Sequence, residues 1–220
     1  MIKKILILGG EGNGGAVAGC IKDMNKRFGY QDLKVSGFLN DKVEIGSEIN
    51  GYPVMGKTED VHKFGKENYY FIFAVCPIAK GQVRINLFDR LCIPEERLLT
   101  IVHPSSFIGE GTVLSPGVVV MPNCFISIYT KIGVGTYINA GASIGHHSKI
   151  GRLCFCSRSS VIGSYISIGD ASDVSLNATV IEKVKIGTCS VVGAGAMLRN
   201  DIGDYEIHVG IPAKLLKKLK

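Results

Sequence analysis

Between Val102 and Leu198 the chain places an apolar residue at every sixth position without a break. In a chain with 46% hydrophobic residues, an unbroken run of 17 such positions in any of six phases has odds of about one in a hundred thousand. The positions are Val102, Ile108, Leu114, Val120, Ile126, Ile132, Ile138, Ile144, Ile150, Cys156, Ile162, Ile168, Val174, Val180, Ile186, Val192 and Leu198. This pattern predicts a structure built from six-residue units.

A second pattern supports the first, because the residue two positions before each apolar one is small or β-branched. From Ser106 to Ala196 it is Ser, Thr, Ala, Val or Cys, with Ile166 as the exception. Residues two apart on an extended chain point to the same side, so each unit sends two side chains inward. A Gly often follows the apolar residue, and we expect it to permit a sharp corner. Short strands joined by corners predict a parallel β-helix rather than a β-sandwich, whose irregular strands would not hold one phase.

The first hundred residues lack this rhythm and alternate strand-like and helix-like segments. The expected strands are 4–8, 33–39 and 70–75. One helix is expected after the glycine-rich segment, ending near residue 26, and two more at 58–64 and 82–91, with Thr58 as a possible N-cap. This alternation predicts a small Rossmann-like parallel α/β sheet at 1–100. The β-helix with a C-terminal tail then occupies 101–220.

A glycine-rich loop follows the first expected strand. Gly10, Gly12 and Gly15 have the spacing of a dinucleotide-binding fingerprint, and backbone N–H groups at such a helix N-terminus hold a phosphate or sugar hydroxyl. Asp41 ends the next strand, where an acidic residue meets a ribose or base. Because the domain has roughly half the length of a full dinucleotide fold, a mononucleotide or nucleotide sugar is the better hypothesis. A tight turn without a ligand is the alternative.

Composition and charge narrow the setting of the protein. The seven cysteines have no metal-binding or disulfide-framework spacing, and Cys124, Cys154 and Cys156 fall on inward positions, as expected of a reduced, cytoplasmic protein. No segment is long and apolar enough to span a membrane or to serve as a signal peptide. Part of the formal charge of +6 lies at 214–220, which predicts the solvated face of a terminal helix or a surface that attracts a phosphate-rich ligand. Aromatic residues are not interleaved with these lysines, which argues against nucleic acid.

The adjacent pair His146 and His147 is the best candidate for chemistry from the residues alone. It interrupts neither inward pattern, so it lies on a corner outside the core, where a neutral imidazole acts as a general base near pH 7. A solvated surface pair without a role is the alternative. No histidines have the spacing of a zinc site, so no metal is expected, and no motif supports a Ser-His-Asp nucleophile.

Six short motifs are spread along nearly the whole chain, at 7–14, 37–41, 101–105, 139–141, 144–146 and 209–214. Together they resemble bacterial sugar acetyltransferases with a left-handed β-helix, the group that modifies nucleotide-linked amino sugars or sialic acid. The resemblance implies a homotrimer that uses acetyl-CoA in surface glycan or lipopolysaccharide biosynthesis, with each active site between neighbouring β-helices. Acetyl-CoA is then expected along the β-helix, and the nucleotide of the sugar in the first domain.

The resemblance also implies site residues. His146 matches the catalytic base, and Asn139 matches a polar position near the sugar. Positions that match nucleotide-sugar contacts are Glu11, Gly12, Asn13, Asn40 and Asp41. Positions that match the acetyl-CoA site are Phe155, Leu176 and Ala194, with the backbone N–H of Ser164 as the expected oxyanion donor.

Three residues depart from the family's pattern. His147 follows the base where the family commonly has Glu or Asp, and a second imidazole supplies no fixed negative charge. Asn40 replaces the first of two paired acids, which leaves open the nucleobase that the nucleotide site prefers. Cys76 replaces a Gly at the edge of that site, which predicts a tighter or differently shaped pocket.

Three functional hypotheses follow. The leading one is transfer of an acetyl group to the amine of a nucleotide-linked deoxyamino sugar (UDP, dTDP or GDP), with His146 as general base. The second is O-acetylation of a sialic acid or another sugar hydroxyl; the missing carboxylate beside His146 favours nitrogen, because a hydroxyl is harder to deprotonate than a neutral amine. The third is a non-catalytic trimeric nucleotide-binding scaffold. A nicotinamide-dependent oxidoreductase is disfavoured, because nothing in the β-helix supplies a hydride-accepting site.

Overall fold

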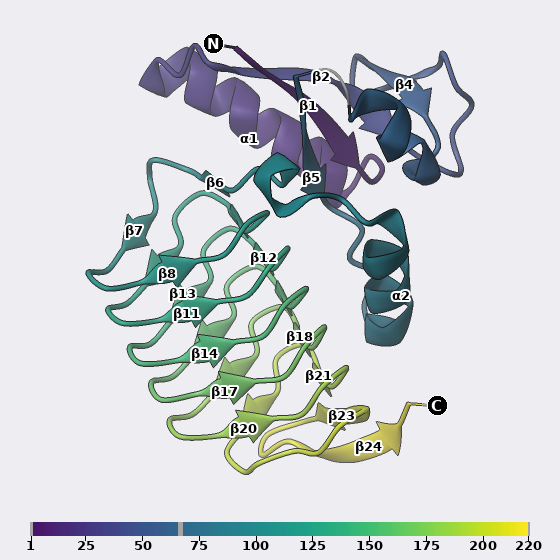
Figure 1. Cartoon of the computed structure of the whole chain (residues 1–220). Coiled ribbons are helices and arrows are strands. Elements are labelled where there is room, and N and C mark those ends of the chain that lie inside the picture. The colour runs from purple at the N-terminus through teal and green to yellow at the C-terminus, as the bar shows by residue number, and fades with distance from the viewer. Residues whose placement is uncertain (1, 66–67, 220) are drawn as a thin grey trace.

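The computed structural model describes residues 2–65 and 68–219, and its first part is a five-stranded sheet flanked by helices (Figure 1). The strand order is β3-β4-β2-β1-β5, and all neighbours run parallel except the β3–β4 hairpin. The elements are β1 (Lys3–Leu8), α1 (Asn13–Phe28), β2 (Leu33–Leu39), β3 (Glu48–Ile49), β4 (Tyr52–Gly56), the 3-10 helix η1 (Thr58–Phe64), β5 (Tyr69–Phe73), α2 (Gly81–Leu91) and the 3-10 helix η2 (Glu95–Arg97). The predicted α/β sheet is confirmed.

One hairpin of this sheet was missed from the sequence, and the expectation for Thr58 is wrong. The β3–β4 hairpin was not predicted, because neither strand has a long enough run of apolar residues to stand out. Thr58 is not an N-cap: Lys57 precedes the 3-10 helix, and the Thr58 hydroxyl instead donates to the Asp41 carboxylate at 2.8 Å.

The second part is a left-handed β-helix with three sheets, each made of two-residue strands stacked one coil above the next. Strands pair in register with strands 18 residues away, so one coil has three six-residue units. The domain-facing sheet is β6 (Ile101–Val102), β9 (Val119–Val120), β12 (Tyr137–Ile138), β15 (Phe155–Cys156), β18 (Asp173–Val174) and β21 (Val191–Val192), continued by β23 (Glu206–Val209) and β24 (Lys214–Lys218). The apolar sheet is β7 (Phe107–Ile108), β10 (Phe125–Ile126), β13 (Ser143–Ile144), β16 (Val161–Ile162), β19 (Thr179–Val180) and β22 (Met197–Leu198). The lysine sheet is β8 (Val113–Leu114), β11 (Lys131–Ile132), β14 (Lys149–Ile150), β17 (Ser167–Ile168) and β20 (Lys185–Ile186).

The two inward patterns build the core of this β-helix, as predicted. The six-residue apolar positions share one cluster, and only those of the first coil remain partly exposed. The second pattern is buried beside it, including Cys124 and Cys154. Most of its hydroxyls donate to a backbone carbonyl of the next coil, as Thr136 Oγ1 does to the Gly151 carbonyl at 2.8 Å. Among the described residues the buried Ser160 Oγ is the exception, because it has no hydrogen-bond partner. Buried hydroxyls therefore cross-link coils rather than weaken the core.

The glycines that follow the apolar residues have a different role from the expected one. The left-handed backbone conformation (positive φ) occurs at the third residue after the apolar position, as in Gly135 and His147. The glycine that directly follows the apolar residue does not adopt it. A Cβ added at Gly133 would lie 2.5 Å from the Arg152 amide nitrogen, and one at Gly145 would lie 2.6 Å from the Ser164 nitrogen. These glycines are therefore required because successive coils approach closely at the corner.

The lysine-rich C-terminus is a strand, not the expected terminal helix. β24 pairs antiparallel with β23 and closes the last coil of the β-helix (Figure 1). Lys218 Nζ lies 3.3 Å from Glu206 Oε1. The amphipathic pattern suggested a helix, but the same residues also suit an edge strand whose side chains are all exposed.

The two parts of the chain pack through the domain-facing sheet. Its outward side chains, among them Tyr137 and Phe155, share a hydrophobic cluster with β1 and α1. Below them, Arg84 of α2 donates to Asp173 at 2.9 Å and to the Ala171 carbonyl at 2.8 Å, and both charged side chains are 1% exposed. Burial raises the pKa of the Asp173 carboxyl, and the Arg84 guanidinium opposes that shift. In the described part of the chain no helix is long and apolar enough to cross a membrane.

Gly133→Ala is expected to lower the free energy of unfolding by about 1–3 kcal/mol, because the new methyl group meets backbone atoms of the next coil. The matched control is Gly19→Ala in α1, where an added Cβ meets nothing within 4 Å, and which is expected to be neutral or stabilising. Urea unfolding followed by circular dichroism measures both. Equal stability of the two variants would refute the close-packing role.

Arg84→Met is expected to cost about 3–5 kcal/mol, because it leaves the Asp173 charge buried without its partner. The double variant Arg84→Met, Asp173→Leu is expected to recover much of this loss. Arg90→Met on the same helix removes an exposed pair with Glu59 and is expected to change stability by less than about 1 kcal/mol. Thermal and urea unfolding compare the three variants, and an Arg84→Met protein as stable as Arg90→Met would contradict the role of the buried pair.

Candidate functional site

A pocket of about 480 Å³ lies where the parallel strands of the first sheet end. It brings together residues from the loops after β1, β2 and β5. Among the predicted substrate-binding residues, Asn13, Asn40, Asp41 and Cys76 line it. Glu11 and Gly12 belong to the same loop as Asn13 but do not line the pocket themselves. The carboxyl edge of a parallel sheet is the usual ligand position in such folds.

Asn40 organises this pocket from within. Its Nδ2 donates to the Gly9 carbonyl at 2.8 Å, and its Oδ1 accepts from the amides of Lys42 and Val43 at 2.8 and 2.9 Å. A carboxylate at this position could not donate to Gly9. Asn40 therefore ties the β1 loop to the β2 loop, a structural role that the sequence did not reveal.

Asp41 is also engaged in the structure. Its Oδ1 accepts from the Thr58 amide at 2.9 Å, and the Thr58 hydroxyl contacts both carboxylate oxygens at 3.0 and 2.8 Å. This arrangement fixes the start of η1 against the pocket wall. Because Oδ1 contacts both the amide and the hydroxyl of Thr58 and Oδ2 only the hydroxyl, Oδ2 has more lone-pair capacity left to accept a hydrogen bond from a ligand.

Cys76 sits at the rim of the pocket as a half-buried thiol. Burial raises its pKa to about 12, against a smaller opposing effect of Arg84. The side chain is therefore a neutral, weakly polar wall at physiological pH and not a nucleophile.

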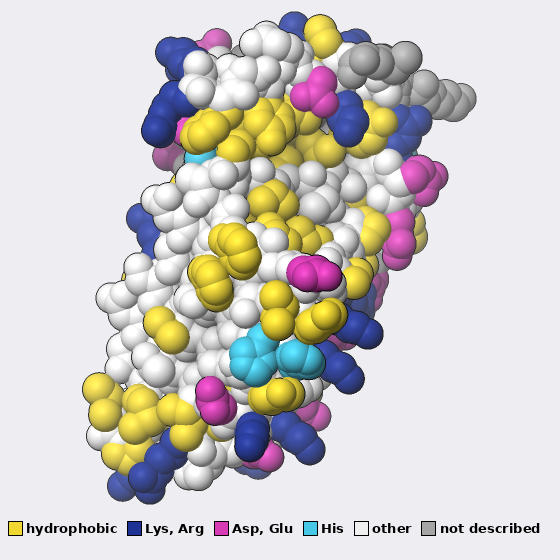
Figure 2. All heavy atoms as spheres, turned by 90° about the vertical axis from the view of Figure 1, so that its left-hand side faces the viewer, with side chains coloured by type: hydrophobic (Ala, Val, Ile, Leu, Met, Phe, Trp, Pro, Cys, Tyr) yellow, Lys and Arg dark blue, Asp and Glu magenta, His cyan; other side chains and the backbone are white. Residues whose placement is uncertain are grey.

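The histidine pair lies on the second corner, which joins the apolar sheet to the lysine sheet (145–148 in this coil). His146 Nδ1 is 3.0 Å from His147 Nδ1, so the N–H of one ring donates a hydrogen bond to the nitrogen of the other. His147 stacks on Tyr165 at 5.2 Å and 25°, and Tyr129 lies 5.2 Å away on its other side. Figure 2 shows histidine side chains among hydrophobic ones on this face, with basic side chains beside them.

Ser164 lies one coil beyond the histidines on the same second corner. Gly145, which precedes His146, is so close to Ser164 that no Cβ fits between them. The amide of the next residue, Tyr165, donates to the His146 carbonyl at 3.0 Å. Within the described residues the Ser164 amide itself has no hydrogen-bond partner. A free N–H thus stands beside the histidine pair.

Asn139 lies on the first corner, which joins the domain-facing sheet to the apolar sheet. It lines a groove of about 620 Å³ between this corner and α1, together with Arg158 and His103. Leu176 and Ala194 occupy the same corner in later coils, and the Gly195 amide donates to the Leu176 carbonyl at 2.8 Å. Within one chain, Asn139 and His146 are separated by strand β13 and occupy different corners.

Phe155 has a third location. It lies on β15 of the domain-facing sheet, is 6% exposed and packs 5.5 Å from the ring of Tyr137 in the cluster between the two parts of the chain. The predicted cofactor residues are therefore divided between the first corner (Leu176, Ala194), the second corner (Ser164) and this buried cluster. A single chain does not bring them together.

Two features near these positions were missed from the sequence. The rings of Tyr129 and Tyr165 flank the histidines because positions 18 residues apart stack in adjacent coils. In the groove of Asn139, His103 is 2% exposed, with Nε2 3.0 Å from Asp23 Oδ2 and Nδ1 2.7 Å from Ser105 Oγ. Ser105 Oγ also accepts from the Asn123 amide, so this chain of contacts fastens α1 to the first coils.

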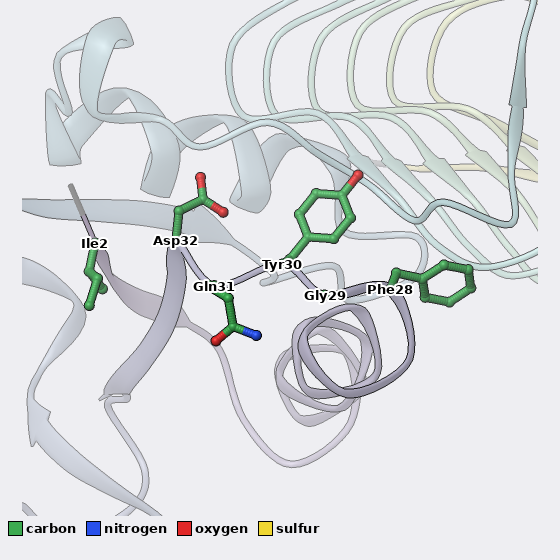
Figure 3. Close-up of a pocket in the computed structure, with 6 residues that line it drawn as sticks. All are labelled: Ile2, Phe28, Gly29, Tyr30, Gln31 and Asp32. Carbon is green, nitrogen blue, oxygen red and sulfur yellow. The ribbon is translucent and has the colours of Figure 1, made fainter.

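The cavity at the turn between α1 and β2 contains no predicted site residue. It has a volume of about 570 Å³ and is lined by Ile2 and residues 28–32 (Figure 3). The side chains drawn there splay in different directions from the turn rather than converging on one point. It is therefore not the candidate site.

Comparison with known proteins supports the fold along the chain. Residues 4–91 match the family model described as the PglD N-terminal domain, and no curated protein matches. A variant of perosamine N-acetyltransferase from Caulobacter crescentus, solved with CoA and GDP-perosamine, is 24% identical over 99% of both chains, with a TM-score of 0.82. The acetyltransferase domain of PglB from Neisseria gonorrhoeae is 22% identical over 97% of this chain and 100% of that one, with a TM-score of 0.82. WeeI from Acinetobacter baumannii is 21% identical over 97% and 100%, with a TM-score of 0.79.

At these identities the comparisons show a shared fold. The predicted combination of a small α/β domain and a left-handed β-helix is confirmed, and so is the resemblance in architecture to hexapeptide-repeat sugar acetyltransferases.

The chemistry of the cysteines provides a test of the pocket geometry. At pH 8 an alkylating reagent is expected to modify the exposed Cys92 first. Cys76 and Cys154 are expected to stay unmodified, because a pKa of about 12 leaves each thiol as thiolate in roughly one molecule in ten thousand. Mass spectrometry of wild type and Cys92→Ser measures this. Modification of Cys76 at the rate of Cys92 would contradict the burial described for the pocket.

Proposed function

We propose that this chain is an acetyl-CoA-dependent N-acetyltransferase that acts on a nucleotide-linked deoxyamino sugar in surface glycan biosynthesis. The observation that carries the proposal is the hydrogen-bonded pair of half-buried His146 and exposed His147 beside the free amide of Ser164 on a β-helix corner. A base beside an unpaired N–H is what acyl transfer needs. The solved structures of the Caulobacter protein, variants in which a histidine is replaced, contain CoA and GDP-perosamine and support the same chemistry.

The proposed reaction is direct attack of the amine on the thioester. The neutral amine nitrogen bonds to the thioester carbon, and the carbonyl oxygen becomes an oxyanion that accepts a hydrogen bond from the Ser164 amide. His146 Nε2 takes the proton from the attacking nitrogen. The C–S bond then breaks, coenzyme A leaves as thiolate and is protonated, and the sugar retains an amide. A preorganised oxyanion donor is typically worth about 3–4 kcal/mol.

The two parts of the chain divide the work in this proposal. Residues 1–100 hold the nucleotide in the pocket of Asn13, Asn40 and Asp41, at the carboxyl edge of the parallel sheet. Residues 101–220 bind acetyl-CoA and supply the base. Leu176 and Ala194 offer exposed apolar contacts along the first corner, where the acyl donor would lie. Phe155 would support this site from beneath, since it is buried, rather than touch the donor.

The active site is completed by a second copy of the chain. The domain-facing sheet is covered and the lysine sheet is charged, whereas the outward residues of the apolar sheet carry no charge. Phe107, Phe125 and Val161 on it are 54%, 47% and 46% exposed. Figure 2 shows hydrophobic side chains gathered on the face that bears histidines. A trimer that buries this sheet would place the second corner of one subunit against the first corner of the next, joining His146 to Asn139.

The cellular setting is proposed to be the cytoplasm. All seven cysteines are free thiols, and six of them are buried or partly buried. Thiols persist in the reducing cytoplasm, where nucleotide sugars and acetyl-CoA are also at hand.

A second candidate keeps the fold and changes the acceptor to a sugar hydroxyl. A hydroxyl needs stronger base assistance, and His147 lends His146 no fixed negative charge, so the amine remains the better acceptor. Screening amino-sugar nucleotides and free sialic acid with acetyl-CoA, and following thiol release, separates the two. Thiol release with sialic acid alone would favour the hydroxyl. Nucleotide binding without any thiol release would favour a non-catalytic scaffold.

His146→Ala is expected to lower kcat for acetyl transfer by about 10²–10⁴-fold, because it removes the general base. His62→Ala, which removes an exposed histidine of the first domain, is the control and is expected to keep full activity. Thiol release measures activity, and size-exclusion chromatography checks that the assembly is unchanged. Activity of His146→Ala within a few-fold of wild type would show that His146 is not the base.

A further inference from the structure

A small pocket adjoins the histidine pair on the side of the lysine sheet. It is lined by Tyr129, Lys131, His147 and Lys149 and has a volume of about 330 Å³. Tyr129 and His147 belong to the surroundings of the histidine pair described above, whereas the two lysines do not. We call the cavity lined by these four residues the lysine pocket.

The two lysines of the lysine pocket face each other across a strand ladder. Lys131 pairs directly with Lys149 in the parallel register of β11 and β14, and both side chains are exposed. Like charges directly opposite each other on a sheet are destabilising. Within the described residues, no carboxylate lies within salt-bridge distance of either lysine. The pair is therefore an uncompensated positive site.

The other two residues of the pocket also favour an anion. The Tyr129 hydroxyl and a ring N–H of His147 are hydrogen-bond donors. The His147 ring stacks on Tyr165 and packs against the tilted ring of Tyr129, so the three rings form a wall of the pocket. Two ammonium groups beside neutral donors suit an anion with several oxygens. We propose that the lysine pocket binds a phosphate group of a substrate, from the diphosphate of the nucleotide sugar or from coenzyme A. This inference rests on the proposed acetyl transfer.

The position of His147 connects this pocket to the base. The Nδ1–Nδ1 contact between His146 and His147 holds one proton. If His147 donates it, His146 carries its own proton on Nε2 and has no lone pair there to act as base. If His146 donates it, its Nε2 is free, and His147 carries a proton on Nε2.

A phosphate in the lysine pocket selects the second arrangement. An anion accepts a hydrogen bond from the Nε2–H of His147, which leaves the Nδ1 of His147 as acceptor for His146. His147 is thus a positioning residue, and the phosphate of the substrate supplies the negative charge that a carboxylate after the base would supply. The free Nε2 of His146 is then available only when the phosphate-bearing substrate is in place.

The binding test uses inorganic pyrophosphate as the probe, with calorimetry on the full chain. The variant Lys131→Gln, Lys149→Gln is expected to weaken binding by at least about tenfold, because two charge-assisted contacts are lost. Lys185→Gln is the matched control: it removes a lysine of the same sheet that faces Ser167 rather than another lysine, and it is expected to bind as wild type does. No binding to wild type, or equal loss in both variants, would overturn the proposal.

Competition identifies the source of the phosphate. Displacement of pyrophosphate by coenzyme A assigns the pocket to the acyl donor, and displacement by the nucleotide sugar assigns it to the acceptor. Failure of both to displace it would overturn the role in substrate binding. These measurements need no turnover, so loss of the proposed acetyl transfer would leave the binding result standing.

A kinetic test examines the positioning role of His147. In the wild-type background the double lysine variant is expected to lower kcat as well as to raise KM. In a His147→Glu background, where a carboxylate faces His146 directly, the same lysine change is expected to affect KM alone. An unchanged effect on kcat in both backgrounds would refute the coupling through His147.

Discussion

The stacking of 18-residue coils is the constraint on which the rest of this structure depends. Each coil hydrogen-bonds to the next along three two-residue strands, and the corners approach so closely that Gly133 and Gly145 leave no room for a Cβ. The interior is filled by two side chains from every six residues. Within such a stack, outward residues 18 apart form straight rows, so any site on the β-helix is built from outward strand and corner positions of neighbouring coils, from the first domain or from another subunit.

This constraint explains both what one chain assembles and what it leaves apart. Residues 18 apart lie in neighbouring coils, which places the Ser164 amide beside His146 and stacks Tyr165 on His147. Asn139 and His146 are seven residues apart and necessarily occupy different corners, with a strand of the apolar sheet between them. The uncharged face of that sheet then gives a physical reason for self-association to complete the site.

The β-helix core was predictable because its periodicity is local: each inward position is defined by residue type alone. The loop pocket was predictable in outline, since Asn13, Asn40 and Asp41 follow strands whose ends meet at one edge. Contacts between distant segments were not. Nothing in the sequence pairs Arg84 with Asp173, and the corner glycines respond to a neighbouring coil rather than to their own backbone angles. The Lys214–Lys218 strand fits a helical pattern equally well, and only its pairing with β23 decides the matter.

The central claim is that catalysis occurs between subunits, with His146 from one chain and Asn139 from the next. Mixed assemblies of His146→Ala and Asn139→Ala chains test it most directly. Each variant alone has a defect in every site, but about a quarter of the interfaces in a random mixture combine the two intact residues. The account predicts that thiol release returns to roughly that fraction of the wild-type rate on mixing. A mixture no more active than its two components would contradict it.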